Sequence, residues 1–202
     1  KSVVIGLCSW FVLDSSGSMT WDINSKTIQG RYHVALLASF AALHYALSHG
    51  CYVAAINFSS SVRTEPWTNN PAYLERILLQ YQGGGTEMPL RKIKELARNH
   101  DRHSLIIIIS DLEIGNWTST KATIMELLSL GNKVISFFID GNPRILESSD
   151  FQELMEFGAK FFCVDDMDDL AGLVISEVQQ QYEPKLEGEA TKKKDESFTF
   201  QP

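Results

Sequence analysis

Residues 3–19 read VVIGLCSWFVLDSSGSM, an apolar run that is followed at once by a short polar loop. Val3–Leu13 is rich in β-forming residues and shows no alternation between apolar and polar positions. That pattern is typical of a strand that is covered on both faces, as the strands of parallel sheets are. The stretch therefore predicts a buried first strand that ends at Asp14, in a loop of turn-forming residues.

Beyond this stretch, segments with strand and helix patterns alternate along the chain. We expect strands over Tyr52–Phe58, Val62–Thr64, Leu105–Ile109, Val134–Ile139 and Lys160–Val164, the second as a short antiparallel edge strand. We expect helices over Arg31–His49, Pro71–Gln80, Thr86–Asn99, Ser119–Leu130, Asp150–Phe157 and Met167–Tyr182. Such alternation predicts a doubly wound α/β fold, with a mostly parallel central sheet and helices on both faces. We expect one domain over residues 1–183. After Pro184 the composition becomes polar, which predicts a disordered tail over 184–202.

The composition excludes several classes of protein. A hydrophobic content of 44% and a net charge of -7 are ordinary for a globular protein, and the acidic charge argues against nucleic-acid binding. The longest apolar stretches, Val3–Leu13 and Val34–Leu47, are shorter than the ~20 residues that span a bilayer, so no membrane association is expected. Cys8, Cys51 and Cys163 lie in apolar runs without a pairing pattern, which predicts reduced, buried thiols and a cytoplasmic location.

The topology predicts a ligand site at one edge of the sheet. In the common strand order 3-2-1-4-5-6, the first and fourth strands are neighbours, and ligands bind beyond their carboxyl ends. Those two strands lead to Asp14 and Asp111, and the glycine-rich residues 83–85 bring Thr86 to the same edge. Two carboxylates and several hydroxyls should therefore lie close together, outside the hydrophobic core.

The loop after the first strand adds hydroxyl groups to this set. Asp14, Ser16 and Ser18 alternate along what we expect to be an extended segment, so that their side chains point the same way. A set made only of oxygen atoms suits a hard cation, with Mg²⁺ as the cellular default and Mn²⁺ or Ca²⁺ as alternatives. Two carboxylates carry about two negative charges, so a bound metal should stay electrophilic.

Three sequence elements in this order resemble the metal-ion-dependent adhesion site of von Willebrand factor A (VWA) domains. They are Asp14-Ser15-Ser16-Gly17-Ser18-Met19, then Gly84-Gly85-Thr86, then Ser110-Asp111 after a run of isoleucines. The likeness covers roughly residues 3–182, and the three elements together are far more specific than the first alone. It implies a Rossmann-like VWA fold and a metal-dependent protein-binding module rather than an enzyme.

The resemblance also assigns roles to the five residues. Ser16, Ser18 and Thr86 would touch the metal, Asp14 and Asp111 would hold it largely through water, and an Asp or Glu of a protein partner would complete it. The long polar insert before the first helix is similar to the CoxE-like group, whose domains work with MoxR-type AAA+ ATPases. Such an ATPase is therefore a candidate partner. The oligomeric state is left open.

Several side chains close to these five are candidates for contact with the partner. Family members often have Gly after the last Asp, and a bulkier, more acidic loop here should narrow the choice of partner. Met and Trp are enriched in interfaces, although local packing of each side chain is the alternative. The candidates are Met19, Trp21, Glu87, Met88, Glu113 and Trp117.

Two other functions compete with protein binding. One is a metal-assisted phosphohydrolase with Asp14 as the nucleophile, and the other is a structural domain without a bound metal. The hydrolase is disfavoured because the position two residues after Asp14 is Ser16 rather than an acid, and no His or Lys lies beside the motif to act as a base. Residues 83–85 are not followed by Lys, which excludes a phosphate-binding P-loop.

Overall fold

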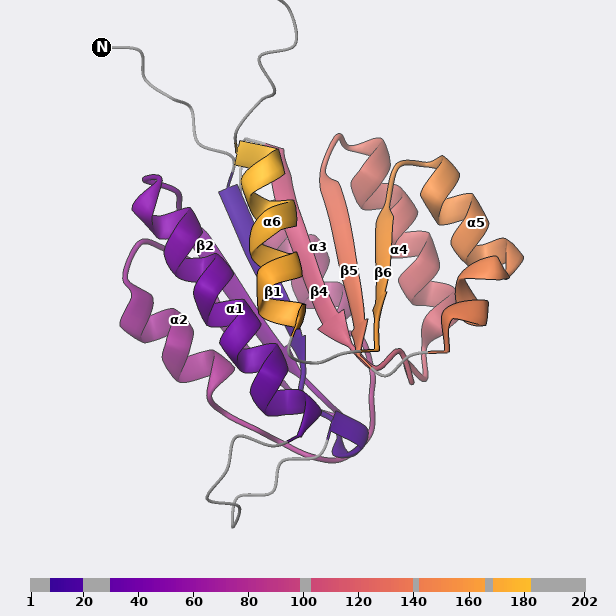
Figure 1. The fold of residues 1–202 in the computed structure, drawn as a ribbon, viewed down its shortest axis with the longest axis horizontal. Helices are drawn as coiled ribbons and strands as arrows, with labels where there is room; N and C mark the ends of the chain where they lie inside the picture. Colours follow the sequence, from indigo (N-terminus) through magenta and orange to yellow (C-terminus); the bar gives the residue numbers. More distant parts are fainter. Residues whose placement is uncertain (1–7, 20–29, 99–102, 140–141, 166–168, 183–202) are drawn as a thin grey trace, which may run out of the picture.

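A single six-stranded sheet forms the centre of the molecule (Figure 1). The computed structural model describes residues 8–19, 30–98, 103–139, 142–165 and 169–182. The strand order is β3-β2-β1-β4-β5-β6, and each neighbouring pair is parallel except β2 and β3. The strands are β1 Cys8–Asp14, β2 Val53–Phe58, β3 Val62–Thr68, β4 Ser104–Ser110, β5 Lys133–Ile139 and β6 Lys160–Val164. The predicted doubly wound fold and strand order are confirmed.

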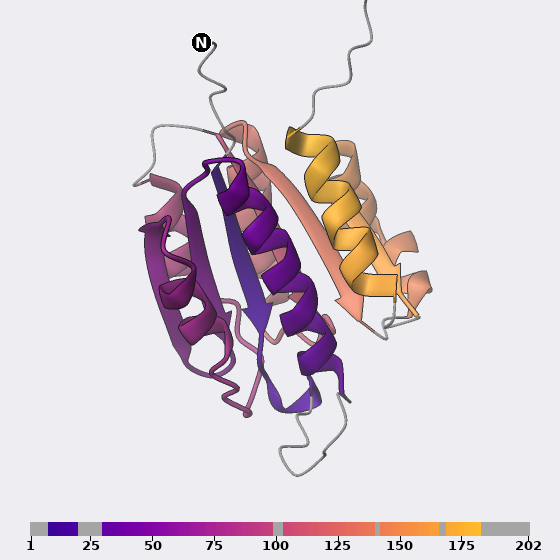
Figure 2. The same ribbon diagram turned by 60° about the vertical axis from the view of Figure 1, so that its left-hand side comes forward.

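Helices cover both faces of this sheet. The α-helices are α1 Arg31–Ser48, α2 Pro71–Leu78, α3 Leu90–Arg98, α4 Trp117–Ser129, α5 Ser149–Glu156 and α6 Leu170–Tyr182. Short 3₁₀ segments lie at η1 Gly17–Met19 and η2 Pro143–Glu147. Residues of α1, α2 and α6 belong to one core cluster, and residues of α3, α4 and α5 belong to the other. Figure 2 shows α1 and α6 side by side on their common face.

The central strands divide their side chains between these two cores. In β1, Phe11 and Leu13 pack into the cluster with α1, whereas Trp10 and Val12 pack into the cluster with α3 and α4. Successive side chains of a strand point to opposite faces, so a strand between two layers of helices must be apolar at every position. This explains why the first strand shows no alternation, as its sequence predicted.

The parallel pairing of β1 with β4 sets the level at which their loops begin. Leu13 lies opposite Ile109, so both strands end at the same edge of the sheet, the lower edge in Figure 1. Asp14 is the last residue of β1, and Asp111 follows the last residue of β4. The two aspartates are therefore brought to one edge, as expected.

Some predicted boundaries are wrong. β3 reaches Thr68 instead of ending at Thr64, because it pairs with the full length of β2 as an edge strand. The helix that was expected to begin at Thr86 begins at Leu90, where the Pro89 carbonyl accepts the first helical hydrogen bond from Ile93. The fixed φ angle of proline suits the start of a helix and explains the later boundary.

Other predictions fall partly or wholly outside the described residues. These are the first part of the strand over Val3–Leu13, the start of the helix over Met167–Tyr182 and the tail over 184–202. All three cysteines are free, as predicted, but Cys163 is only half-buried because β6 is the edge strand of the sheet. Among the described residues, every helix is too short or too polar to cross a membrane.

Two leucines of α1 give a test of the core. Leu43 is fully buried, whereas Leu37 on the same helix is 43% exposed. We expect Leu43→Ala to lower the free energy of unfolding by about 2–5 kcal/mol, because it removes buried methyl groups and leaves a cavity. Leu37→Ala is the matched control and should change it by less than about 1 kcal/mol. Equal effects in urea denaturation would show that α1 is packed differently.

Candidate metal centre

Asp14 is the most deeply buried carboxylate of the candidate site. Its side chain is completely shielded from solvent, one oxygen accepts a 2.8 Å hydrogen bond from the Ser16 backbone N–H, and the other accepts a 2.6 Å bond from the Ser110 hydroxyl. Burial raises the pKa of Asp14, the charge of Asp111 adds to this effect, and the bonds from Ser110 and Ser16 oppose it. The expectation that the five residues lie outside the core is therefore wrong for Asp14, and Ser16 and Asp111 are buried as well. Asp14 also links β1 to β4.

The two serines of the first loop lie together, but not for the predicted reason. Gly17–Met19 forms a 3₁₀ turn, so the segment is not extended and its side chains do not simply alternate. The turn nevertheless places the Ser16 and Ser18 hydroxyl oxygens 3.1 Å apart. Ser16 is fully buried and Ser18 is half-buried, so the pair lies at the boundary between the fold and solvent.

Main-chain hydrogen bonds hold the glycine-rich loop against the first loop. The Gly83 N–H donates to the Ser15 carbonyl and the Gly17 N–H donates to the Gly84 carbonyl, both at 2.8 Å. Gly84 has a φ of 87°, and a Cβ atom there would lie 2.5 Å from the Ser60 hydroxyl. Only glycine fits this position without strain.

A second set of bonds ties Thr86 to the loop after Asp111. The Thr86 carbonyl accepts from the Gly115 N–H at 2.8 Å. The Asn116 side chain accepts from the Met88 N–H at 2.9 Å and donates to the Met88 carbonyl at 3.0 Å. The structure thus joins the three predicted loops at one edge. Gly115 and Asn116 were not predicted as part of the site, and their only signal was their position next to the motifs. Ser110 belonged to a predicted motif but was given no role there.

Asp111 has an oxygen atom without a hydrogen bond. Its Oδ1 accepts from the Glu113 N–H at 3.3 Å, whereas its Oδ2 is buried and has no hydrogen-bond partner within the described part of the chain. Among the described residues, the Arg31 guanidinium forms an ion pair with Asp111: its Nη1 lies 3.7 Å from Oδ2, a distance that suits charge attraction but is too long for a hydrogen bond. A buried carboxylate oxygen without a donor is unfavourable, and a cation at this point would satisfy it.

The donor set fits a hard cation. Within the described ranges, no group of three or more His, Cys, Asp or Glu side chains could hold a metal ion. A metal held by Asp14 and Asp111 would therefore need hydroxyl oxygens as well, and Ser16, Ser18 and Thr86 lie in the loops that are joined to both aspartates. Sets of carboxylate and hydroxyl oxygens suit Mg²⁺ better than a transition metal.

Two of the predicted partner contacts are wrong. Met19 is fully buried in the core with α1, and Met88 is 3% exposed in the core with α3 and α4. Both methionines fill the interior beneath the loops, which is where an adaptable apolar side chain packs well. Trp21 lies outside the described residues.

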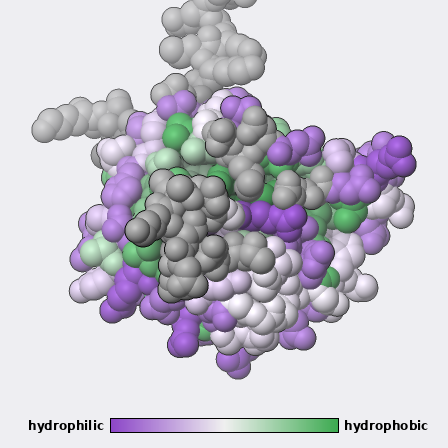
Figure 3. All heavy atoms as spheres, turned by 60° about the horizontal axis from the view of Figure 1, so that its bottom comes forward, coloured by the Kyte–Doolittle hydropathy of each residue, from purple (hydrophilic) through white to green (hydrophobic). Residues whose placement is uncertain are grey.

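The other three candidates lie at the surface to different degrees. Glu87 and Glu113 are exposed, and both belong to loops that carry a candidate ligand. Trp117 is half-buried: its ring stacks on Phe151 at 4.6 Å and its indole N–H donates to Asp150. Figure 3 views the molecule from this side, and its visible surface mixes hydrophilic and neutral residues with smaller apolar areas.

The residue after Asp111 has an unusual backbone. Leu112 has a φ of 69° and is the only described residue other than glycine with a positive φ. This left-handed conformation favours glycine, which the sequence analysis expected from the family at this position. The side chain of Leu112 packs against the core with α3 and α4, and this contact offsets part of the backbone strain.

The fold was compared with known structures. No protein-family model matches the sequence, and no curated protein matches it. The chain is similar in structure to the von Willebrand factor domain of the type V pilus tip protein Mfa5 from Porphyromonas gingivalis, with a TM-score of 0.71, 10% identity and coverage of 89% of this chain and 96% of that one. The chain has the von Willebrand factor A fold.

Two further solved structures share this fold. A von Willebrand factor type A protein from Catenulispora acidiphila aligns with a TM-score of 0.63 and 15% identity, over 87% of this chain and 42% of that one. The pilus adhesin SpaC from Lactobacillus rhamnosus GG aligns with a TM-score of 0.69 and 14% identity, over 90% of this chain but only 31% of the adhesin. The chain thus matches one VWA-sized part of some longer proteins.

The strain at Leu112 in this VWA fold can be measured by comparing two variants. At ordinary positions a glycine variant is less stable than an alanine variant by about 0.5–1 kcal/mol. Both Leu112→Gly and Leu112→Ala lose the leucine packing, but only alanine keeps a Cβ atom in the left-handed conformation. We therefore expect Leu112→Gly to be the more stable of the two by about 1 kcal/mol in urea denaturation. If Leu112→Ala is instead the more stable variant, as at ordinary positions, Leu112 does not have the left-handed conformation.

The two hydrogen bonds between the Asn116 side chain and the Met88 backbone give a second stability test. Asn116→Ala leaves the Met88 N–H and carbonyl without these bonds, so we expect a loss of about 1–3 kcal/mol in stability. Asn116→Asp keeps the acceptor but not the donor, and its loss should be intermediate. Chemical denaturation measures both. If Asn116→Ala is as stable as the wild type, the side chain does not hold the two loops together.

Proposed function

We propose that this domain is a metal-dependent protein-binding module, and that its Mg²⁺ site is completed by an Asp or Glu of a protein partner. Ser16, Ser18 and Thr86 would supply direct ligands, and Asp14 and Asp111 would supply negative charge, largely through water. When bound, the metal would offer an electrophilic coordination position to an incoming carboxylate. Mn²⁺ and Ca²⁺ are alternative metals for the same oxygen donors.

One observation carries this proposal: the buried Asp111 oxygen that has no hydrogen bond within the described residues. It lies on the loop that is joined to Thr86. Burial raises the pKa of the neighbouring Asp14, and the charge of Asp111 adds to this effect. Two nearby carboxylates, one of them with an unsatisfied oxygen, form a site whose free energy falls when a cation enters.

The geometry around Asp14 argues against the phosphohydrolase alternative. A nucleophilic carboxylate must reach the substrate, yet Asp14 is fully buried and each of its oxygens accepts a hydrogen bond. The attacking atom would have to leave the bonds from Ser16 and Ser110. Hence the same interactions that fix Asp14 support a role in binding rather than in nucleophilic attack.

The class of partner is a further part of the proposal. The structures compared above include a pilus adhesin and a pilus tip protein, and the use of this fold in adhesins is consistent with protein recognition at the site. The similarity to the CoxE-like group makes a MoxR-type AAA+ ATPase the first candidate to test. A pull-down with such an ATPase, in Mg²⁺ and in EDTA, tests this assignment separately from metal binding.

The metal site is tested most sharply at Asp111. Asp111→Asn keeps the shape of the side chain and removes one negative charge, so Mg²⁺ affinity in calorimetry should fall about 10- to 100-fold. Asp150→Asn is the matched control, because Asp150 is an aspartate that contacts Lys121 and Trp117 rather than the site, and it should bind Mg²⁺ as the wild type does. Equal affinities of Asp111→Asn and the wild type would rule out the proposed site.

A second comparison separates metal binding from partner binding. Thr86→Ala removes a hydroxyl but no charge, so we expect it to weaken partner capture more than Mg²⁺ binding, and Thr86→Ser should restore both. Asp14→Ala is a poorer probe, because it also removes the acceptor for Ser16 and Ser110. The chelator-controlled pull-down is the measurement for partner capture.

A further inference from the structure

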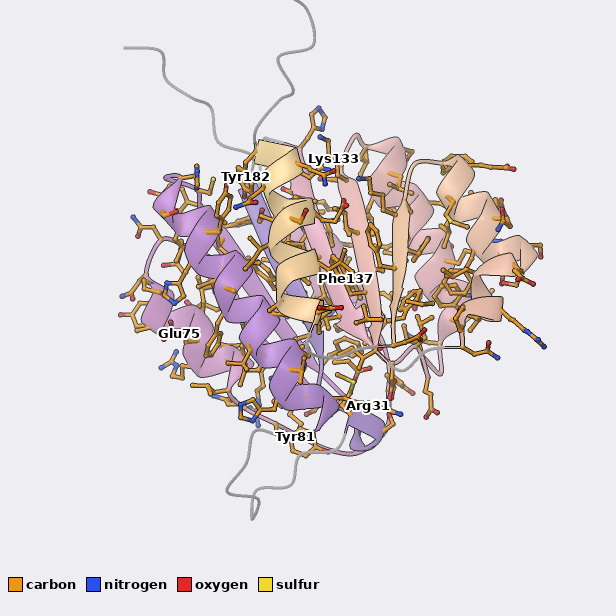
Figure 4. The ribbon with its side chains drawn as sticks, in the orientation of Figure 1. Arg31, Glu75, Tyr81, Lys133, Phe137 and Tyr182 are labelled. Carbon is orange, nitrogen blue, oxygen red and sulfur yellow. The ribbon has the colours of Figure 1, made fainter. Side chains whose placement is uncertain are left out.

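Arg31 is a positively charged side chain that contacts the candidate metal centre. It is the first residue of α1 and follows Gly30, whose φ of 104° lies in the region that favours glycine. Its Nη1 donates to the Ser18 carbonyl at 3.3 Å and lies 3.7 Å from Asp111 Oδ2. Figure 4 shows Arg31 at the same end of the molecule as Tyr81, whose hydroxyl donates to the Ser16 carbonyl.

The Arg31 side chain is more exposed to solvent than the Asp111 side chain with which it pairs. The Arg31 side chain is 32% exposed, whereas that of Asp111 is 3% exposed. The guanidinium therefore reaches the buried carboxylate from the solvent side. The contact with Asp111 is longer than a hydrogen bond, so charge attraction accounts for it, and the guanidinium also donates to the Ser18 carbonyl. A cation that binds Asp111 would have to displace the guanidinium from this position.

We propose that Arg31 neutralises Asp111 while the site holds no metal, and that it becomes a second cationic partner for a carboxylate once the metal is bound. This inference rests on the proposed function. A divalent cation beside Asp111 repels the guanidinium, so the two compete for the same oxygen. A displaced guanidinium still lies within one side-chain length of the site, where an incoming Asp or Glu would meet two positive groups.

The arrangement makes metal and carboxylate binding depend on each other. Without a carboxylate, the positive charge of Arg31 weakens the binding of a cation. With a carboxylate present, the same charge adds to its attraction, because arginine pairs with carboxylates through fixed, directed donors. Arg31 would thus favour a partner that presents an acidic side chain over one that presents a neutral oxygen.

Mg²⁺ calorimetry at low ionic strength tests the first half of the proposal. We expect Arg31→Gln to bind Mg²⁺ about three- to tenfold more tightly than the wild type, and Arg31→Lys to resemble the wild type. Arg76→Gln is the matched control, because Arg76 also lies 3.7 Å from a carboxylate, that of Glu65, in an ion pair between α2 and β3. Affinity of Arg31→Gln that equals or falls below that of the wild type would overturn the competition.

A double-mutant cycle in EDTA tests the ion pair without any metal. We expect Arg31→Gln to lower the folded-to-unfolded ratio about two- to fivefold in the wild-type background, and to have little effect in Asp111→Asn. Equal effects in both backgrounds would show that Arg31 does not neutralise Asp111. If the wild type binds no Mg²⁺, the proposed function fails, yet this cycle still decides whether the ion pair exists.

Acetate serves as the carboxylate probe for the second half. Mg²⁺ affinity is measured in sodium acetate and in sodium chloride at equal ionic strength. Acetate should tighten Mg²⁺ binding more in the wild type than in Arg31→Gln, because only the wild type offers the guanidinium as well. If the ratio of the Mg²⁺ affinity in acetate to that in chloride is the same in both proteins, Arg31 has no role in carboxylate recognition. That result would leave the metal site in place.

Discussion

Two carboxylates lie close together in this protein because β1 and β4 are parallel neighbours that end at the same level. A parallel sheet with helices on both faces leaves the ends of its central strands as the place where polar side chains can gather. The hydrogen bond from Ser110 to Asp14 joins the two strand ends directly. Other contacts of the site join the loops that follow these two strands to the glycine-rich loop.

The loops reinforce one another through different kinds of bond. Main-chain bonds pair residues 15–17 with residues 83–84, and the Asn116 side chain binds the backbone of Met88. Asn57 adds a polar link beneath them, since its amide donates to the carbonyls of Ile77 and Gln80 and its oxygen accepts from Ser15. The site is therefore held from below and from both sides, which limits the movement of its oxygen atoms before any ligand arrives.

The sequence predicted those features that depend on local pattern. Unbroken apolar runs identified the buried strands, and the order of strands and helices predicted which strand ends would meet. The later start of α3 was missed because the Glu87 N–H donates to the Ser59 carbonyl and the Met88 N–H donates to the Asn116 side chain, which holds both residues in an irregular segment before Pro89. The burial of Met19 and the contact of Arg31 with Asp111 were missed for the same reason: each depends on residues that are distant in the sequence.

Main-chain atoms of Ser15, Gly17, Gly83 and Gly84 pair the first loop with the glycine-rich loop. These main-chain bonds do not depend on the identity of the exposed side chains around them, such as Glu87 and Glu113. Surface loop residues vary readily during evolution, whereas the scaffold that positions them changes slowly. Substitutions of these exposed side chains would thus change the surface of the domain, while the backbone beneath them keeps its hydrogen bonds.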